Sequence, residues 1–239
     1  MIPNKKEYTQ FDILGTEYTL PLVNSGSKTK EHILMEATIL FAKTGYHAVS
    51  MRDLAEVIGI KPASLYNHFP GKEALWEAVL EHTIDLYMLY FKQVDEMLGK
   101  ARSLAEVLEV MFSELKKLRN LFTCYAFSLI QAEQFRDPRC GHFFNGTFLE
   151  YSIDFVQRWF DKCVEQKMAP PFDTKMVSNI FMHCVLIGLN VKVHQTLGRP
   201  TPYEPGEMFV DLQDFLYRSI TGTAKASNQG AAEDCDFSE

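Results

Sequence analysis

The chain lacks most features that mark secreted, membrane or disulfide-rich proteins. Its five cysteines, at positions 124, 140, 163, 184 and 235, stand singly without a Cys-x-x-Cys pair, which excludes a disulfide framework and favours reduced thiols. The first ten residues, MIPNKKEYTQ, contain charges but no apolar core, so no signal peptide is predicted. The most apolar run, residues 180–189, is too short to span a membrane. We therefore expect a soluble cytoplasmic protein without a membrane partner.

An excess of positive charge is also missing, because the 239 residues carry a formal net charge of −7. This balance argues against a general nucleic-acid binder. The charge is uneven, however, because basic residues outnumber acidic ones within residues 25–72 and the acidic excess lies elsewhere. A modest basic block on an acidic chain predicts a local anionic partner.

Hydrophobic periodicity predicts helices, and no strand, after residue 24. The expected helices are 28–44, 51–58, 62–69, 72–98, 102–119, 121–134, 138–168, 173–197 and 205–221. We therefore predict an all-α protein in which a three-helix unit is joined to a larger helical domain.

The predicted division of the chain has four parts: 1–24, 25–72, 73–223 and 224–239. The first part alternates apolar and polar residues around a Leu-Gly-Thr-Glu turn, which fits a small hairpin, an extended arm or a disordered leader. The last part is rich in Gly, Ala, Ser and acidic residues, which predicts a disordered tail.

Residues 50–69 have the layout of a helix-turn-helix, with a short capped helix, a glycine turn and a second short helix. At about 100° per residue, placing Leu65 inward directs Ala63 and Asn67 outward. The flanking positions are Ser64, Tyr66 and His68. A helix in the major groove needs outward groups for base edges and flanking polar groups for phosphates. Such residues are often merely solvated when they occur alone, but here they occur together.

Two cations stand where a helix dipole disfavours them. Lys72 lies at the start of the long helix 72–98, and Arg52 lies in the first turn of the helix 51–58. Both positions make sense if a phosphate binds there, jointly with free backbone N–H groups. Arg52 also has the length to reach a guanine edge.

These motifs resemble the DNA-binding domain of the TetR/AcrR family of transcriptional regulators, over about a fifth of the chain. The similar segments are LFAKTGY at 40–46, SMRDLAEVIGI at 50–60, PASLYNHF at 62–69 and KEAL at 72–75. The resemblance implies a repressor that binds double-stranded operator DNA. The implied phosphate contacts are Ser50, Ser64, Tyr66, His68 and Lys72. The implied base-reading positions are Arg52, Lys61, Pro62, Ala63 and Asn67. Because Pro62 has no side-chain donor, any base reading there must be apolar.

The resemblance also implies a homodimer formed through the last two helices, which carry apolar stripes. The first stripe is Met176, Ile180, Cys184, Ile187 and Val191, with Gly188 allowing close approach of a partner. The second is Phe209, Leu212, Leu216 and Ile220. The alternative is that both stripes face the core of their own subunit.

An effector pocket is expected among the aromatic and methionine residues of the larger domain. The candidates are Met111, Phe122, Tyr125, Phe144, Phe148, Tyr151, Phe155 and His183. Any one of them alone is more often a core residue, but together they favour a small apolar or aromatic effector.

Other functions have less support in the sequence. One alternative is a helical module that binds a ligand or protein and keeps a vestigial DNA-binding unit. An enzyme would have to use His142, His183 and Cys184, which show no pairing of base and nucleophile. Isolated His and Cys residues also lack metal-ligand spacing. We therefore predict neither catalysis nor a metal or other cofactor.

Overall fold

The described part of the chain is almost entirely helical, as the periodicity predicts. In this computed structural model the described residues are 11–12, 17–18, 25–117, 121–201 and 205–222. The first four helices are α1 (Ser25–Thr44), α2 (Met51–Ile58), α3 (Pro62–His68) and α4 (Lys72–Leu98). They are followed by α5 (Leu104–Lys117), α6 (Leu121–Glu133), α7 (Pro138–His142), the π-helical segment η2 (Phe143–Glu150), α8 (Tyr151–Glu165), α9 (Thr174–Thr196) and α10 (Pro205–Thr221).

The turns of the N-terminal unit follow from local chemistry. Ser50 caps α2 by accepting a hydrogen bond from the Asp53 amide, and the Asp53 carboxylate accepts one from the Ser50 amide, which completes a capping box. Gly59 then ends α2 at a φ of 75°, a left-handed conformation that glycine adopts without strain. Pro62 begins α3, where a missing N–H costs nothing. These signals explain why the short helices begin and end where the sequence predicts.

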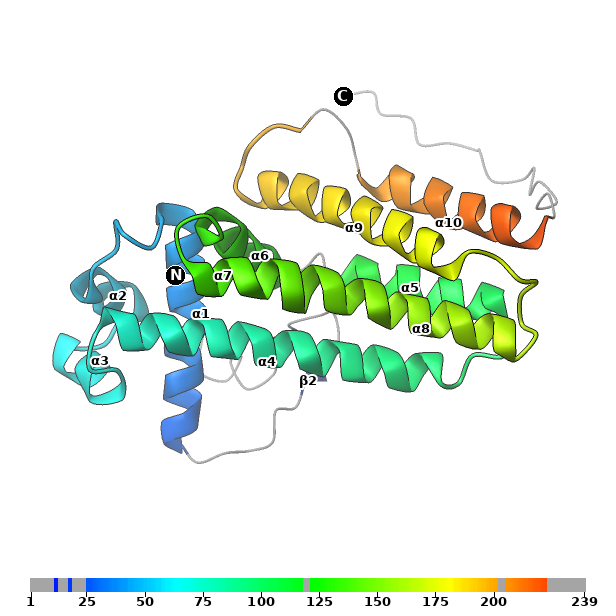
Figure 1. The fold of residues 1–239 in the computed structure, drawn as a ribbon. Coiled ribbons are helices and arrows are strands. Elements are labelled where there is room, and N and C mark those ends of the chain that lie inside the picture. The colour runs from blue at the N-terminus through cyan, green and yellow to red at the C-terminus, as the bar shows by residue number, and fades with distance from the viewer. Residues whose placement is uncertain (1–10, 13–16, 19–24, 118–120, 202–204, 223–239) are drawn as a thin grey trace, which may run out of the picture.

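Helix α4 begins beside α2 and α3 and runs along the rest of the molecule (Figure 1). Helices α2 and α3 lie at its beginning and, with α1, form the head; α5–α10, η2 and the rest of α4 form the body. Helix α1 packs against α2 and α4 and also against α6, so the head touches the body directly. Buried Trp76 in α4 packs edge-on against Phe41 of α1. The head is therefore held to the body by α4 and by the contact between α1 and α6.

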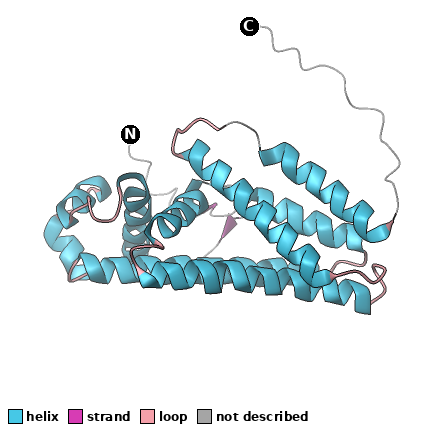
Figure 2. Cartoon of the chain, turned by 45° about the horizontal axis from the view of Figure 1, so that its top comes forward, coloured by secondary structure: helices cyan, strands magenta, loops and turns pink. Residues whose placement is uncertain are grey.

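One continuous apolar core runs through the head and the body. Helix α9 packs against α6, α8 and α10, and α10 also packs against α5. Helices α9 and α10 lie side by side on the side of the body away from α4 (Figures 1 and 2). By length and mean hydropathy (1.5), α9 would qualify as a membrane span, but one face of it packs against three other helices of the body.

The prediction of one helix over residues 138–168 was wrong in its middle. Residues 143–150 form η2, in which the backbone N–H of Tyr151 bonds to the carbonyl of Gly146, five residues earlier. Three phenylalanines of this segment, Phe143, Phe144 and Phe148, are buried. A π-helical turn contains an extra residue and rotates the following helix about its axis, and an apolar count over a long window does not reveal that rotation.

Most of the two terminal parts, 1–24 and 224–239, lies outside the described residues. Within the first part, Phe11–Asp12 (β1) pairs antiparallel with Glu17–Tyr18 (β2), with Phe11 opposite Tyr18. Of the three arrangements considered for this part, a hairpin is the one that contains such a pair. The predicted disordered tail stays a prediction.

Candidate functional site

Helix α3 turns its polar rim outward, and the orientation predicted from the helical wheel is confirmed. Leu65 is fully buried, and Phe69, just after the helix, is buried as well. Ala63 and Asn67 are exposed, and Tyr66 exposes 50% of its surface despite its large ring. The two remaining rim residues, Ser64 and His68, are half-buried. The rim is therefore free to contact a ligand as large as a duplex, although the individual DNA contacts stay predictions.

The other candidate DNA contacts surround this rim. Lys61 and Pro62 are exposed at the start of α3, and Arg52 is exposed in the first turn of α2. Ser50 is exposed, and its side-chain oxygen accepts a hydrogen bond from the Asp53 amide. Hydrogen bonds from Ser50 lower the pKa of Asp53, which therefore stays ionised.

Lys72 is held in place at the first residue of α4. Its Nζ lies 4.3 Å from the centroid of the Tyr46 ring and 3.4 Å from the His47 carbonyl oxygen, to which it donates a hydrogen bond. Partial burial lowers the pKa of Lys72, and the charge of Asp53 opposes that shift. The result is an ordered cation beside α2 and α3, where it can meet a phosphate without first losing much rotamer freedom.

Behind Lys72, charged and aromatic side chains connect the head to the body, and we call this group the junction network. Arg139 of α7 lies 2.8 Å from Glu73 and 3.4 Å from Glu77, both on α4. It also pairs with Asp137 at 2.7 Å. The indole Nε1 of Trp76 donates to the Asp137 carboxylate at 2.7 Å. The start of α7 is therefore tied to the first two turns of α4.

The junction network also includes Tyr46, in the turn after α1. Its hydroxyl donates to the second oxygen of Glu73 at 3.0 Å, and its ring lies under Lys72. Burial, followed by the hydrogen bond with Glu73, raises the pKa of Tyr46 to about 12. The Arg139 guanidinium and the Trp76 indole hold the pKa of Asp137 well below its usual range. Sequence reasoning missed this network because it treated Asp137 and Pro138 only as a break between helices.

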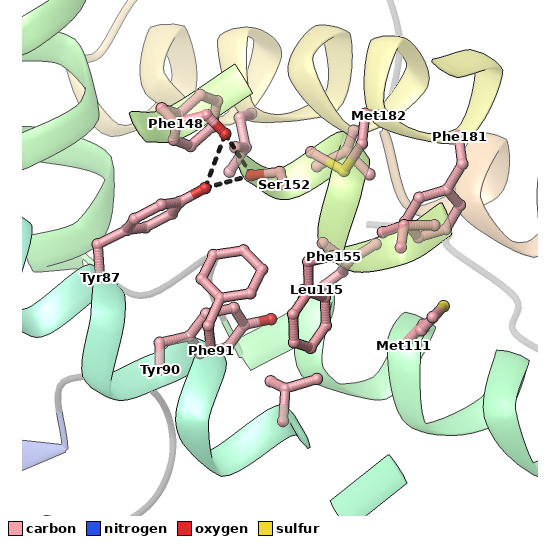
Figure 3. A pocket seen from close by; sticks show the side chains of 14 residues that line it. Tyr87, Tyr90, Phe91, Met111, Leu115, Phe148, Ser152, Phe155, Phe181 and Met182 are labelled. Atoms are coloured by element: carbon pink, nitrogen blue, oxygen red, sulfur yellow. Dashed lines mark hydrogen bonds between the residues drawn. The ribbon is translucent and has the colours of Figure 1, made fainter. Parts of the chain in front are cut away.

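A cavity lies in the body between α4, α5, η2, α8 and α9 (Figure 3). Measured for a water-sized sphere, its volume is about 50 Å³, which is below the range of small-molecule sites, so a ligand would have to displace some of the lining side chains. Fourteen residues line it: Tyr87, Tyr90, Phe91, Val94, Met111, Leu115, Phe148, Ser152, Phe155, Val156, Phe181, Met182, Val185 and Leu189. None of them carries a charge.

The structure brings three of the predicted pocket residues to this cavity: Met111, Phe148 and Phe155. Four others do not line it. Tyr125 is buried with its ring under Lys43, Phe144 stacks on Phe148, and Tyr151 packs edge-on against Phe91. His183 is exposed, with Nδ1 2.7 Å from the Asn179 carbonyl oxygen, so it belongs to the surface of α9 and not to the cavity. The side chain of Phe122 lies outside the described residues.

Sequence reasoning missed α4 as a wall of the cavity. Tyr87, Tyr90, Phe91 and Val94 all belong to α4, from which no pocket residue was predicted. Their spacing of three and four residues is the signal that could have found them, because it places them on one helical face.

The predicted dimer stripes fare differently on the two helices. On α9, Met176, Ile180 and Ile187 are exposed, Cys184 and Val191 are half-buried, and Gly188 is buried. On α10 the prediction was wrong, because Phe209, Leu212, Leu216 and Ile220 are all buried. This stripe faces α5 and α9, and Phe209 packs against Phe112 of α5. The exposed apolar residues of α10 are instead Val210 and Phe215, at 58% and 59% exposure.

The part of the chain that the structure describes contains no metal site, and two of its thiols are made less acidic by burial. No group of three or more His, Cys, Asp or Glu residues there could hold a metal ion. Burial raises the pKa values of Cys140, to about 12, and of Cys163, to about 11, which keeps both thiols protonated and unreactive.

The head is a capped three-helix unit with an outward polar helix, and one long helix joins it to a helical body with an apolar cavity. This arrangement is that of helix-turn-helix DNA-binding regulators. A family model described as "Bacterial regulatory proteins, tetR family" matches residues 33–79. This match and the relatives described next show that the chain is similar to TetR-family transcriptional regulators, most clearly over the head and the start of α4.

One relative is the HTH-type transcriptional regulator UidR of Escherichia coli K12. It is 25% identical over 154 residues, which is 64% of this chain and 76% of UidR. Two solved structures share the fold. A protein of Saccharomonospora viridis in complex with choline has a TM-score of 0.64 and 18% identity, over 81% of this chain and 98% of that one. The ketosteroid transcriptional regulator KstR2 of Mycobacterium tuberculosis has a TM-score of 0.58 and 20% identity, over 84% and 97%.

Proposed function

We propose that the protein is a homodimeric repressor that binds a near-palindromic operator and is released from it by a small apolar or aromatic effector. The observation that carries this proposal is the rim of α3, where Leu65 anchors the helix and Ala63, Tyr66 and Asn67 face outward. A surface of this kind suits a major groove, because Asn67 can form two hydrogen bonds with adenine and Ala63 can contact a thymine methyl. The protein would act in the cytoplasm and without catalysis.

A second subunit is needed because one short helix reads few base pairs. In dimeric helix-turn-helix proteins, two recognition helices enter successive major grooves about 34–36 Å apart. The apolar residues exposed on adjacent helices α9 and α10 support such a dimer: Met176, Ile180, Ile187, Val210 and Phe215. Apolar residues gathered on neighbouring helices of a soluble protein are typical of a protein–protein interface.

The junction network supports a coupling between effector and DNA. Phe148 and Phe155 line the cavity and belong to the continuous run of η2 and α8, which begins directly after α7. Arg139 of α7 holds Glu73, which in turn holds Tyr46 beneath Lys72. An effector that shifts η2 would therefore shift the support of α4 and of Lys72. If it binds better to a form whose two heads are wrongly spaced, effector and operator oppose each other by linkage.

The direct test is fluorescence anisotropy with duplexes from the upstream region of the protein's own gene. We expect Tyr66→Ala and Lys72→Ala each to weaken binding, on the order of 10-fold for the loss of one phosphate contact. Lys72→Ala should also lower the slope of log affinity against log salt by about 1. Lys100→Ala is the matched control, because it removes the same charge from an exposed residue just beyond the other end of α4.

Unchanged affinity in both variants would overturn the assignment of the rim to DNA. A reporter gene behind the bound sequence distinguishes repression from activation, because deletion of the regulator should raise expression if it represses.

A further inference from the structure

The cavity contains a polar corner, and its hydrogen-bonding capacity restricts the ligand. The Tyr87 hydroxyl lies 2.9 Å from the carbonyl oxygen of Phe148 and is also hydrogen-bonded to the Ser152 hydroxyl. The Ser152 hydroxyl donates to the same Phe148 carbonyl. Figure 3 shows the three oxygens as a closed triangle at one edge of the cavity. We call it the oxygen triangle.

The oxygen triangle has no proton to spare. It contains two hydroxyl protons, one on Tyr87 and one on Ser152, because a carbonyl only accepts. In either arrangement both protons serve bonds within the triangle, to the Phe148 carbonyl or to the other hydroxyl. What remains is lone pairs on the hydroxyl oxygens. Burial raises the pKa of Tyr87 above its ordinary value, so the phenol does not ionise. The triangle therefore accepts a hydrogen bond from a ligand and offers none.

The rest of the lining excludes charge. Aromatic, aliphatic and methionine side chains make up nearly all of it, and no Lys, Arg, His, Asp or Glu takes part. A carboxylate or ammonium group moved from water into these surroundings would lose its hydration without gaining a partner ion. From the triangle the cavity extends towards Met111, Leu115 and Phe181, which together provide an apolar end (Figure 3).

We infer that the ligand is an uncharged, largely apolar alcohol or phenol whose hydroxyl donates to the Tyr87–Ser152 pair while its apolar part extends towards α5. This inference rests on the proposed effector site and names the ligand class for it. It also assigns ligand specificity to Tyr87 and Ser152, which favour a ligand that donates a hydrogen bond over one that can only accept. The Tyr87 and Ser152 hydroxyls are themselves hydrogen-bonded to the Phe148 carbonyl of η2, the segment that continues from α7.

Direct binding to the DNA-free protein tests the inference. Isothermal titration uses four probes with the same eight-carbon chain: 1-octanol, 2-octanone, octanoate and octyltrimethylammonium. We expect 1-octanol to bind at least about 100-fold more tightly than either ion. The ketone presents only an acceptor to an accepting site, so it should bind roughly 3- to 10-fold more weakly than the alcohol.

Variants localise the effect. Tyr87→Phe combined with Ser152→Ala should abolish the preference for the alcohol over the ketone while both probes still bind. Ser178→Ala is the control, because Ser178 also bonds to a carbonyl four residues earlier but does not line the cavity. Tyr90→Phe removes the remaining hydroxyl of the lining and should leave the preference intact. Melting temperatures establish that each variant is folded.

Three outcomes would overturn the inference: tightest binding of octanoate or octyltrimethylammonium, equal binding of ketone and alcohol, or a preference that depends on Tyr90 alone. Absence of binding for all four probes would overturn it as well. The effector role is tested separately by adding 1-octanol to the protein–DNA complex. Binding of 1-octanol to the protein without release of DNA would contradict the proposed function and leave the ligand class standing.

Discussion

Helices α3 and α10 both carry large side chains, but they use them in opposite ways. In α3 a single anchor, Leu65, is buried, so the direction of every other side chain follows from it. In α10 two sets of apolar residues lie on different faces, one buried and one exposed. A helix with one large apolar anchor can bury that anchor in only one orientation. A helix with two apolar faces can bury either face, so its neighbours determine its orientation. The comparison explains why the orientation of α3 was predicted correctly and that of α10 was not.

The sharpest way to break this comparison is to truncate one phenylalanine from each face of α10. Phe209→Ala should lower the free energy of unfolding by about 3–5 kcal/mol, because it leaves a cavity beside Phe112. Phe215→Ala should change the folding of each subunit little and instead shift the protein from dimer to monomer. Guanidinium unfolding and analytical ultracentrifugation measure the two effects. If Phe215→Ala left the association unchanged, the exposed face of α10 would not be the dimer interface.

A pair of substitutions in α3 separates folding from reading of DNA. Leu65→Ala should cost about 2–5 kcal/mol of stability, because Leu65 is fully buried. Asn67→Ala should leave stability within about 0.5 kcal/mol and weaken operator binding by about 1–3 kcal/mol, without changing binding to unrelated DNA. Thermal unfolding and competition anisotropy give the two quantities. An equal loss of affinity for operator and unrelated DNA would show that Asn67 does not read bases.

The smallest expected effect concerns the junction network and depends on pH. Asp137 has a lowered pKa in the folded protein, so its ionised form stabilises the fold above the unfolded pKa of about 3.9. That contribution decreases as the pH falls below this value and the carboxylate gains a proton. Asp137→Asn should therefore cost roughly 1 kcal/mol at pH 7 and progressively less below about pH 4. Urea unfolding of both proteins at pH 7 and pH 3 measures the difference, and a difference that grew in acid would contradict the assignment.

Much of the fold could be predicted from the sequence because local signals mark the ends of its helices. Ser50, Gly59 and Pro62 act through their own backbone chemistry, so α2 and α3 were placed to within a residue. The start and end of α4 at Lys72 and Leu98 were also predicted. In the head, the outward set of residues followed from one anchor and a helical period.

The remaining features depend on contacts between residues far apart in the chain. Arg139 meets Glu73 across 66 positions of sequence, since 139 − 73 = 66, and no local pattern announces such a pair. The aromatic residues of the body show the same limit. Phe144 and Phe148 are both buried and stack on each other, but only Phe148 lines the cavity. Composition predicted an apolar site, but the residues that line it are decided by how five elements pack together.

The length of α4 has a mechanical consequence. Its 27 residues form a rod about 40 Å long, at 1.5 Å per residue. A tilt of about 5° at one end of such a rod moves the other end by about 3.5 Å, close to the 3.4 Å rise between base pairs. If α3 lies in a major groove as proposed, a tilt of this size is enough to put it one base pair out of register.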